Sequence, residues 1–549
     1  MNLTLTLASS LLLPLSLPNE LFPTGAILPG LLALVPVLLV VYRTASRRSA
    51  SRYGLLFGTV STLLGNYWLA FFGEFSVWTI GGVVIAYAGY NYLLFGYLHF
   101  IAHRGRSAVD TLAPLTVERA HRGTAMRPLW IAVAWTGYEY LKSVGFLGYP
   151  WGLVAYPLAT LNSVAQIAEM GGVWALSFLA AYINSSVAEL FYTRETRSAT
   201  PGTGSFRRSL THRTTLLAPR HLLAAVLLVV SAGAFGTWRV STLQPVENLD
   251  LLLVQQNIDS WRPGGFPDAL MQAQELTLSR LRDLDSADSV DAVVWSETAL
   301  RRPYTGASNY YSQTPAVMPF VAFLDRMNVP LITGAPMPAG ADGRDAANSA
   351  LVISPEGVLL GSYAKQQLVP FAERIPLWHL TWVRRFFREV VGLQGTWVPG
   401  AQSNPLPLPL ADGRRIPIGT PICFEDAFGW VPRRMARSGA RLLINLTNDS
   451  WSRQESAQTQ HFAAARLRTI ELRTTLVRST NSGLSTVVDA RGVATQSLPM
   501  FSATARSVTV PLYPEMWTLY RALGDWLGIL AAAGAILRVI WLAIRRDRG

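Results

Sequence analysis

Cysteine and lysine are the scarcest reactive residues in this 549-residue chain, and each scarcity narrows the chemistry open to it. Cys423 is the only cysteine, so no disulfide can form within the chain and no cysteine-based metal site is available. Lysine occurs only as Lys142 and Lys365, among 47 Lys and Arg residues. Since arginine supplies the other cations, a lysine indicates a position that requires a compact ammonium rather than a planar guanidinium.

Hydrophobic residues make up 50% of the chain, which is too apolar for one soluble domain, while the second half is too charged to lie wholly in a membrane. Residues 1–246 carry 17 Lys and Arg against 8 Asp and Glu, whereas residues 247–537 carry 26 against 25. The basic excess lies in short runs between apolar segments. This pattern favours orientation in a bilayer over a nucleic-acid surface, so we expect no nucleic-acid partner.

Eight apolar stretches approach the length of a transmembrane helix. They lie at about 3–18, 26–42, 54–73, 79–102, 128–147, 164–187, 221–240 and 526–543. The first is short and contains Pro14 and Pro18, so an interfacial segment is the alternative to a membrane anchor there. The eight stretches together predict a polytopic helical bundle.

Arginines are concentrated in every second loop between these stretches. They occur at 43–52, 104–127, 194–220 and 545–548. By the positive-inside rule, those loops and both chain termini are cytoplasmic. The long segment between the seventh and eighth stretches then faces the periplasm or its equivalent.

Residues 247–515 show a different pattern, in which short strands alternate with amphipathic helices. This pattern predicts a layered α/β domain, and the segment is long enough to bury one core. We therefore predict a membrane domain of seven transmembrane helices at 1–246 and an extracytoplasmic catalytic domain at 247–515. A final transmembrane helix with a cytoplasmic tail is predicted at 516–549.

Three reactive side chains, Glu297, Lys365 and Cys423, stand at the ends of predicted strands, where α/β folds usually place their sites. A thiol is mostly protonated at neutral pH and needs a base or a nearby cation to become a nucleophile. We expect Glu297 to take the proton and Lys365 to stabilise the thiolate and a later oxyanion. The backbone N–H of Phe424 is the expected second oxyanion donor. We expect His461 to have a structural role.

These residues in their sequence contexts resemble the Glu-Lys-Cys triad of the nitrilase superfamily. Fusion to a multi-helix membrane segment resembles the apolipoprotein N-acyltransferase family. Several motifs carry this second resemblance: Val-Gln-Gln-Asn-Ile at 254–258, Leu-Val-Pro-Phe-Ala-Glu at 368–373, Thr-Asn-Asp-Ser-Trp at 447–451 and Gln-His-Phe-Ala-Ala-Ala-Arg at 460–466. The match extends over nearly the whole chain.

The resemblance implies an αββα sandwich for the catalytic domain and a ping-pong acyl transfer in the bacterial inner membrane. The acyl donor would be a phospholipid, with phosphatidylethanolamine expected, and a diacylated apolipoprotein would be the acceptor. No cofactor or metal is implied, and we expect a monomer. The family pattern also implies supporting or substrate-binding roles for Glu373, Glu425, Trp451 and Trp261. The segment 259–265, which contains Trp261, departs from the usual family spacing.

Two other functions are compatible with parts of the sequence. A membrane-tethered nitrilase-like amidase would use water as the acceptor, although seven helices exceed what a tether requires. A transporter or receptor would have little use for the three reactive side chains. The aromatic and basic segment between Trp378 and Trp397 is typical of an interfacial helix, or of an amphipathic helix packed on the core of its own domain.

Overall fold

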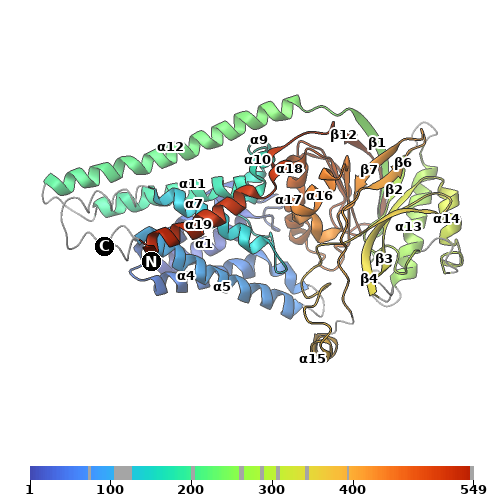
Figure 1. Cartoon of the computed structure of the whole chain (residues 1–549), viewed down its shortest axis with the longest axis horizontal. Coiled ribbons are helices and arrows are strands. Elements are labelled where there is room, and N and C mark those ends of the chain that lie inside the picture. The colour runs from blue at the N-terminus through green and yellow to red at the C-terminus, as the bar shows by residue number, and fades with distance from the viewer. Residues whose placement is uncertain are drawn as a thin grey trace. The chain divides into compact units, whose positions relative to one another are not determined.

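The computed structural model describes residues 1–71, 76–103, 126–198, 205–258, 265–284, 290–304, 310–340, 345–391 and 395–544 (Figure 1). The chain divides into two compact units. Unit 1 comprises Met1–Ala70, Val77–Val240 and Asp525–Gly549, and unit 2 comprises Phe71–Ser76 and Ser241–Gly524.

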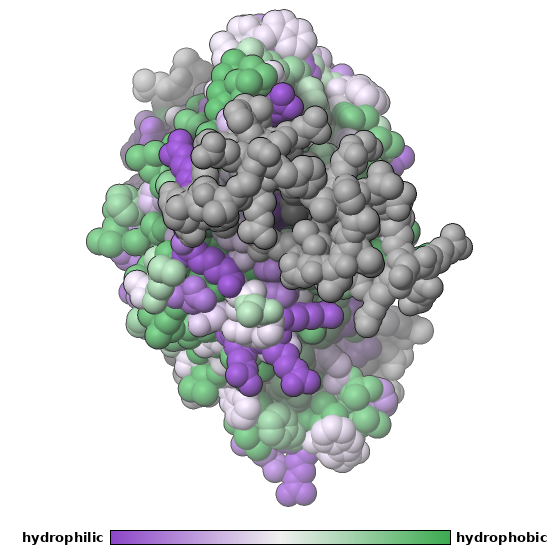
Figure 2. Space-filling view, turned by 90° about the vertical axis from the view of Figure 1, so that its left-hand side faces the viewer, coloured by the Kyte–Doolittle hydropathy of each residue, from purple (hydrophilic) through white to green (hydrophobic). Residues whose placement is uncertain are grey.

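Unit 1 is built of helices, and each of the eight apolar stretches overlaps at least one of them. The helices are α1 (Asn2–Ser16), α2 (Ile27–Leu32), α3 (Val35–Arg43), α4 (Arg47–Gly65), α5 (Ser76–His103), α7 (Arg127–Ser143), α8 (Ala155–Ala159), α9 (Asn162–Ala165), α10 (Ala168–Gly171), α11 (Val173–Ser198), α12 (Ser205–Thr242) and α19 (Trp526–Ile544), with a 3-10 helix at Tyr67–Phe71. On the end face in Figure 2, hydrophilic side chains gather among hydrophobic ones.

Three helical segments in the described part of the chain are long and apolar enough to cross a membrane: Ser76–His103, Val173–Glu195 and Pro219–Thr242. The count of eight membrane spans therefore remains a prediction. The expected continuous helix at 164–187 is wrong, because Gly172 has a φ of 64° and separates α11 from the short helices α9 and α10. The expected helix at 26–42 is likewise divided into α2 and α3.

Buried polar side chains of α7 hold the chain that follows it. Glu139 accepts hydrogen bonds from Ser177 Oγ at 2.6 Å and from the Val154 N–H at 2.9 Å. Lys142 Nζ donates to the Trp151 carbonyl at 2.8 Å and lies 4.9 Å from the centre of the Tyr87 ring. The loop between α7 and α8 is thus fixed by side chains of unit 1 itself.

Unit 2 contains two six-stranded sheets, with strand orders β12-β1-β2-β3-β4-β5 and β11-β10-β9-β8-β7-β6. The strands are β1 (Glu247–Gln255), β2 (Ala292–Val294), β3 (Leu331–Ala339), β4 (Asp345–Ile353), β5 (Leu359–Ala364), β6 (Leu406–Pro409), β7 (Arg415–Gly419), β8 (Leu442–Thr447), β9 (Leu476–Thr480), β10 (Thr486–Val488), β11 (Ala494–Ser497) and β12 (Thr504–Leu512). The core strands β1–β2–β3 and β7–β8–β9 are parallel, and the strands at the edges are antiparallel.

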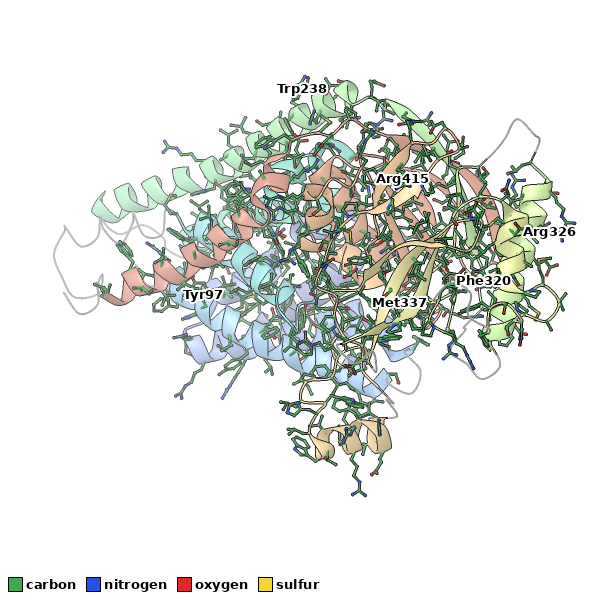
Figure 3. All side chains as sticks on the ribbon, turned by 45° about the vertical axis from the view of Figure 1, so that its right-hand side comes forward. Tyr97, Trp238, Phe320, Arg326, Met337 and Arg415 are labelled. Carbon is green, nitrogen blue, oxygen red and sulfur yellow. The ribbon has the colours of Figure 1, made fainter. Side chains whose placement is uncertain are left out.

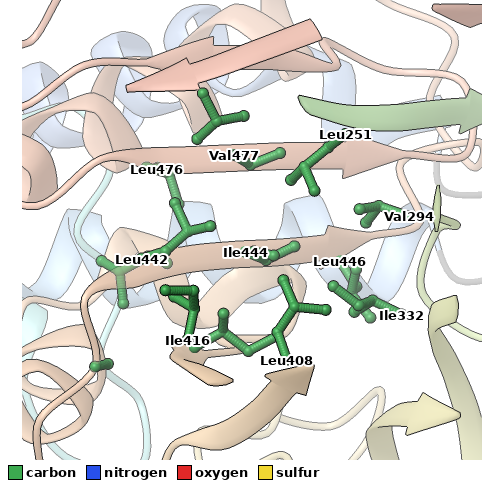
Figure 4. Packing of buried hydrophobic residues seen from close by; sticks show 14 of the residues in the cluster. Leu251, Val294, Ile332, Leu408, Ile416, Leu442, Ile444, Leu446, Leu476 and Val477 are labelled. Atoms are coloured by element: carbon green, nitrogen blue, oxygen red, sulfur yellow. The ribbon is translucent and has the colours of Figure 1, made fainter. Parts of the chain in front are cut away.

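The two sheets pack face to face over a hydrophobic core (Figure 4). Leu251, Val294 and Ile332 of the first sheet belong to the same buried cluster as Ile444 and Val477 of the second. Burial of these side chains away from water is the main driving force for the folding of unit 2. Successive side chains of a strand point to opposite faces of its sheet. Each sheet therefore also has an outer apolar face that other elements must cover.

Helices cover the outer face of each sheet. On the first sheet, α13 (Gly265–Arg282) and α14 (Phe320–Met327) pack over a second buried cluster, and Figure 3 shows Phe320 and Arg326 on different sides of α14. Phe320 is fully buried, whereas Arg326 is exposed. The helices α16 (Trp430–Arg437) and α17 (Glu455–Leu472) accompany the second sheet. The αββα layering expected for the nitrilase-like domain is confirmed.

Sequence patterns missed three strands, β6, β11 and β12. The last of these, β12, pairs with β1 over nine residues in antiparallel register, from Glu247 opposite Leu512 to Gln255 opposite Thr504. The described part of the segment between Trp378 and Trp397 is amphipathic, and an interfacial position for it remains a prediction. It forms α15 (Thr381–Phe386) and a π-helical turn, where Val383 is buried and Trp382 is 68% exposed.

We predict that Gly334→Ala destabilises unit 2 at the β2–β3 junction. A Cβ on Gly334 would lie 2.4 Å from Thr298 N and 2.8 Å from Glu297 Cα, and both are backbone atoms with little freedom to move. Overpacking of this kind costs about 1–3 kcal/mol. Thermal unfolding of the detergent-purified protein, followed by tryptophan fluorescence, should show a melting temperature lower by several degrees, on the order of 2–4 °C per kcal/mol. A Cβ on Gly395 would meet no atom of the described residues within 4 Å, so the matched change Gly395→Ala should leave the melting temperature unchanged. Equal melting temperatures for both variants would contradict the prediction.

Candidate active site

The structure places Glu297, Lys365 and Cys423 at the ends of strands in unit 2. Glu297 follows β2, Lys365 follows β5 directly, and Cys423 begins a 3-10 turn, Cys423–Ala427, after β7. The first two therefore come from one sheet and the third from the other. Packing of the two sheets brings the three groups into one electrostatically coupled cluster.

The Lys365 ammonium lies between two carboxylates. Its Nζ is 3.3 Å from Glu297 Oε1 and 2.8 Å from Glu373 Oε1, and the lysine is 1% exposed. An ammonium has three N–H donors, and the carboxylates use two of them. A third donor thus remains for an oxygen atom of a substrate.

Hydrogen-bond donors fix both carboxylates in place. Asn348 Nδ2 donates to Glu297 Oε1 at 2.7 Å, and the Asn448 N–H donates to Glu297 Oε2 at 2.8 Å. Glu373 Oε2 accepts from the Val369 N–H at 2.8 Å. Sequence analysis missed the role of Asn348, for which the one signal is an amide side chain within a strand whose neighbours are buried and mostly apolar.

Cys423 occupies a backbone conformation that suits a nucleophile but costs energy. Its φ is 48°, in the left-handed region that non-glycine residues seldom adopt. Asn445 Nδ2 donates to the carbonyls of Cys423 and Pro421, each at 3.1 Å, which holds the turn from the neighbouring strand β8. The thiol is half-buried and packs against the hydrophobic cluster between the sheets.

Burial and charge set the protonation states of the cluster. Burial and the Glu297 carboxylate raise the pKa of Cys423 well above its usual value, and the Lys365 cation only partly opposes them. Burial also raises the pKa of Glu297. Burial lowers the pKa of Lys365, but the attraction of Glu297 and Glu373 outweighs it, so the pKa is raised. The resting cluster therefore holds a neutral thiol and a stable ammonium beside the carboxyl group of Glu297.

Glu425 holds the turn that carries the thiol. One oxygen accepts from the N–H groups of Gln366 and Gln367 at 2.6 and 3.0 Å, and the other accepts from the Ile422 N–H at 2.8 Å. The Tyr363 hydroxyl donates to the same carboxylate at 2.9 Å. Burial raises the pKa of Glu425 to about 7, against the effect of these backbone donors.

The structure describes all but one of the other residues named in the sequence analysis. Phe424 is the second residue of the 3-10 turn, with its buried ring against Phe428. Trp451 is half-buried in the loop after β8, and Trp261 lies outside the described residues. His461 Nε2 is 2.7 Å from Asp426 Oδ1, in keeping with the structural role expected for it. In the described part of the chain, no three His, Cys, Asp or Glu side chains converge as metal ligands.

The arrangement is suited to nucleophilic acyl chemistry. A carboxylate of raised pKa can accept the thiol proton, and the thiolate can attack a carbonyl carbon. A fixed ammonium in a buried site stabilises the negative oxygen that develops during this attack.

Two family profiles match the chain in succession. The profile described as "Apolipoprotein N-acyltransferase N-terminal domain" matches residues 9–186, and the profile described as "Carbon-nitrogen hydrolase" matches residues 272–518. Together they cover most of unit 1 before α12 and most of unit 2. Their order agrees with a membrane segment followed by a nitrilase-like domain.

Curated relatives match over nearly the whole chain. An "Apolipoprotein N-acyltransferase 2" from Treponema denticola is 35% identical over 95% of this chain and 94% of its own. The protein of the same name from Treponema pallidum is also 35% identical, over 98% of this chain and 95% of its own. A solved amidase of the nitrilase superfamily from Nesterenkonia is 17% identical and covers 52% of this chain and 95% of its own, with a TM-score of 0.34.

We predict that Glu297→Gln makes Cys423 easier to alkylate. Removal of the negative charge lowers the pKa of the thiol, because Glu297 is the charged group that raises it most. The pH midpoint for reaction with iodoacetamide should fall by on the order of one unit. Since Cys423 is the only cysteine, the mass of the intact protein reports its alkylation without interference.

The matched control for this alkylation experiment is Glu389→Gln. Glu389 is exposed and pairs with Arg385 at 2.9 Å on the segment of α15. This variant should keep the midpoint of the parent protein. A midpoint in Glu297→Gln that stays equal to that of the parent, or rises, would show that Glu297 does not act on the thiol.

Proposed function

The chain belongs to the apolipoprotein N-acyltransferase family, and from this premise we propose that it adds the third acyl chain to bacterial lipoproteins. An acyl chain passes from a phospholipid to Cys423 and then to the α-amino group of the diacylglyceryl-cysteine at the N-terminus of an apolipoprotein. Phosphatidylethanolamine is the proposed donor, and the protein acts as a monomer. The observation that carries the proposal is the cluster of Cys423, Glu297 and Lys365, in a chain related over its length to named N-acyltransferases.

In the first half-reaction, Glu297 takes the proton from Cys423 Sγ and the thiolate attacks the ester carbonyl of the phospholipid. The carbonyl oxygen becomes an oxyanion, which the third N–H of Lys365 and the Phe424 N–H stabilise. When the intermediate collapses, the carbon–oxygen bond breaks and Glu297 returns its proton to the glycerol oxygen. The products are a lysophospholipid and a thioester on Cys423.

In the second half-reaction, the free α-amino group of the apolipoprotein attacks the thioester carbonyl. An α-amino group has a pKa of about 8, so roughly a tenth of it is uncharged and nucleophilic at pH 7. Glu297 takes the proton that the amine loses, the carbon–sulfur bond breaks, and the proton passes to the departing thiolate. An amide forms and the resting thiol is restored.

Glu373 and Glu425 support these steps without taking part in bond exchange. Glu373 shares the Lys365 ammonium with Glu297 and so keeps that cation in place when Glu297 becomes neutral. Glu425 anchors the turn of Cys423 through the Ile422 N–H. Trp451 and Trp261 are proposed to contact the acyl chains.

The amidase alternative is not favoured, because the relationship to N-acyltransferases includes the membrane segment as well as the nitrilase-like domain. The half-buried thiol packs against hydrophobic residues, which limits the access of water to a thioester there. A transporter or receptor would have no need of the buried base and ammonium beside a strained thiol.

For the membrane, we propose eight spans with the catalytic domain in the periplasm and both termini in the cytoplasm. The arginine-rich loops support this orientation by the positive-inside rule. It places Cys423 on the side of the inner membrane where exported apolipoproteins carry their diacylated cysteine. Both proposed substrates are anchored in the adjacent leaflet.

We predict that Cys423 carries an acyl group after incubation with vesicles of phosphatidylethanolamine. Intact-mass spectrometry should show one added acyl chain on the parent protein, removable by neutral hydroxylamine because the bond is a thioester. In Cys423→Ala the adduct should be absent. A synthetic diacylglyceryl-cysteine peptide should discharge the parent adduct and gain the chain as an amide.

Three results of that experiment would count against the proposal. The absence of any adduct would exclude the thioester intermediate. Discharge by water at the same rate with and without the peptide would favour the amidase. An adduct that persists in Cys423→Ala would show that another residue carries the acyl group.

We predict that exposed positions on opposite sides of the proposed membrane differ in their labelling from outside the cell. Gly395→Cys and Arg48→Cys can each be made in the Cys423→Ala background, which has no other thiol; both positions are exposed within their own units. A membrane-impermeant maleimide added to intact spheroplasts should label only the first variant, and lysis should be required for the second. The reverse pattern would contradict the orientation.

A further inference from the structure

Beneath the nucleophile's turn lies a cluster of four buried charged side chains that the proposed reaction does not use. We call Asp426, Asp449, His461 and Arg478 the buried ion quartet. Their exposed fractions are 0%, 3%, 6% and 0%. They come from four different places: the 3-10 turn of Cys423, the loop after β8, helix α17 and strand β9. None of them is accessible to a lipid or a peptide.

In the quartet, each cationic side chain lies between the same two carboxylates. His461 Nε2 is 2.7 Å from Asp426 Oδ1, and its Nδ1 is 3.7 Å from Asp449 Oδ1. Arg478 Nε is 3.2 Å from Asp426 Oδ2, and its Nη2 is 3.9 Å from Asp449 Oδ2. The four side chains therefore tie Asp426 and Asp449 together.

The protonation of His461 completes the charge balance of the quartet. Burial lowers its pKa and the Arg478 cation lowers it further, but the attraction of Asp426 and Asp449 outweighs both and raises the pKa to about 9. At neutral pH this pKa favours a protonated His461, although its Nδ1 also lies 3.3 Å from Arg478 Nη2. Replacing a buried ionic cluster by apolar residues is often neutral for stability, so stability alone does not explain such a cluster.

Each carboxylate of the quartet is close in sequence to a group of the reaction. Asp426 belongs to the same 3-10 turn as Cys423, whose φ of 48° requires support from its surroundings. Asp449 directly follows Asn448, whose N–H donates to Glu297 Oε2 at 2.8 Å. The negative charge of Asp449 also acts on the Cys423 thiol. The quartet thus connects the turn of the nucleophile with the loop that holds the base.

We propose that His461 and Arg478 are positioning residues, which keep the Cys423 turn and the Asn448 loop at the separation that proton transfer from the thiol to Glu297 requires. The proposal rests on the proposed roles of Cys423 and Glu297. It assigns a use to two side chains that touch neither substrate. It also explains why charged groups, rather than apolar ones, link these two segments, because ion pairs specify direction and apolar packing does not.

The test compares His461→Gln with the parent in the rate of Cys423 acylation by phosphatidylethanolamine vesicles. Glutamine keeps an N–H donor for Asp426 but removes the cation and the contact with Asp449. The maximal acylation rate should fall roughly ten- to a hundredfold, the cost of a small misplacement of reacting groups. The lipid concentration for half-maximal rate should stay the same, because the quartet touches no lipid.

A matched control and a second variant accompany this measurement. Arg491→Gln breaks a pair with Asp489, 2.8 Å apart, in the turn between β10 and β11, and should leave the rate unchanged. Asp426→Asn keeps the shape of the side chain and serves if His461→Gln fails to fold. It should slow acylation in the same way, again with an unchanged half-saturating lipid concentration.

Alkylation of Cys423 separates positioning from general loosening of the fold. In His461→Gln the charge of Asp449 is less compensated, so the pKa of the thiol rises further and the pH midpoint for iodoacetamide moves up. Glu297, Glu373 and Lys365 also face the thiol and are unchanged in this variant. A loosened domain would expose Cys423 and move the midpoint down, toward about 8.5.

Three outcomes would overturn the proposal: an acylation rate within twofold of the parent, a slowing explained by a higher half-saturating lipid concentration, or a lowered alkylation midpoint. A different result would test the proposed function instead. If the parent forms no acyl-enzyme at all, the proposed acyltransferase function is wrong. The direction of the alkylation shift still tests the quartet in that case, because it needs no lipid substrate.

Discussion

The burial of the Lys365 ammonium between Glu297 and Glu373 is the interaction on which the rest of the site depends. A buried ammonium is costly unless it is paired and hydrogen-bonded, and here one cation faces two carboxylates. The excess negative charge is stabilised by N–H donors from Asn348, Asn448 and Val369. The three groups therefore depend on one another, since neighbours from other strands set the charge state of each. The same excess charge keeps the resting thiol protonated and makes the base necessary.

This constraint explains why the site needs two sheets rather than one. Lys365 and Glu297 belong to the first sheet, while Cys423 and the loop of Asn448 belong to the second. The hydrophobic core between the sheets sets the distance between these groups. An apolar cluster supplies the driving force but little directional information. The directional contacts come from polar pairs near the strand ends, including Asn445 with Cys423 and His461 with Asp426.

Much of the site was predictable from sequence because its reactive groups follow strands with strong local signals. Glu297, Lys365 and Cys423 each follow a strand that the sequence predicts, and their residue types suit nucleophilic acyl chemistry. Asn348 and Asp426 were not predictable in this way, because their roles depend on partners 51 and 35 residues distant along the chain. The pairing of β12 with β1 has the same non-local origin. In unit 1, apolar length located the helices but did not reveal the break at Gly172, where φ is positive.

The two lysines of the chain show what an ammonium offers that a guanidinium does not. Lys365 places one small cation within 3.3 Å of two carboxylates, which use two of its three N–H donors. Lys142, in the other unit, donates to a single carbonyl, that of Trp151, with the ring of Tyr87 beside it. Both sites are buried, and both give the cation a point contact with oxygen rather than a planar fork. A guanidinium would need a wider, flat space and more acceptors at either position. The scarcity of lysine in this sequence thus follows from the use of arginine for surfaces and ion pairs, with the compact cation kept for two confined sites.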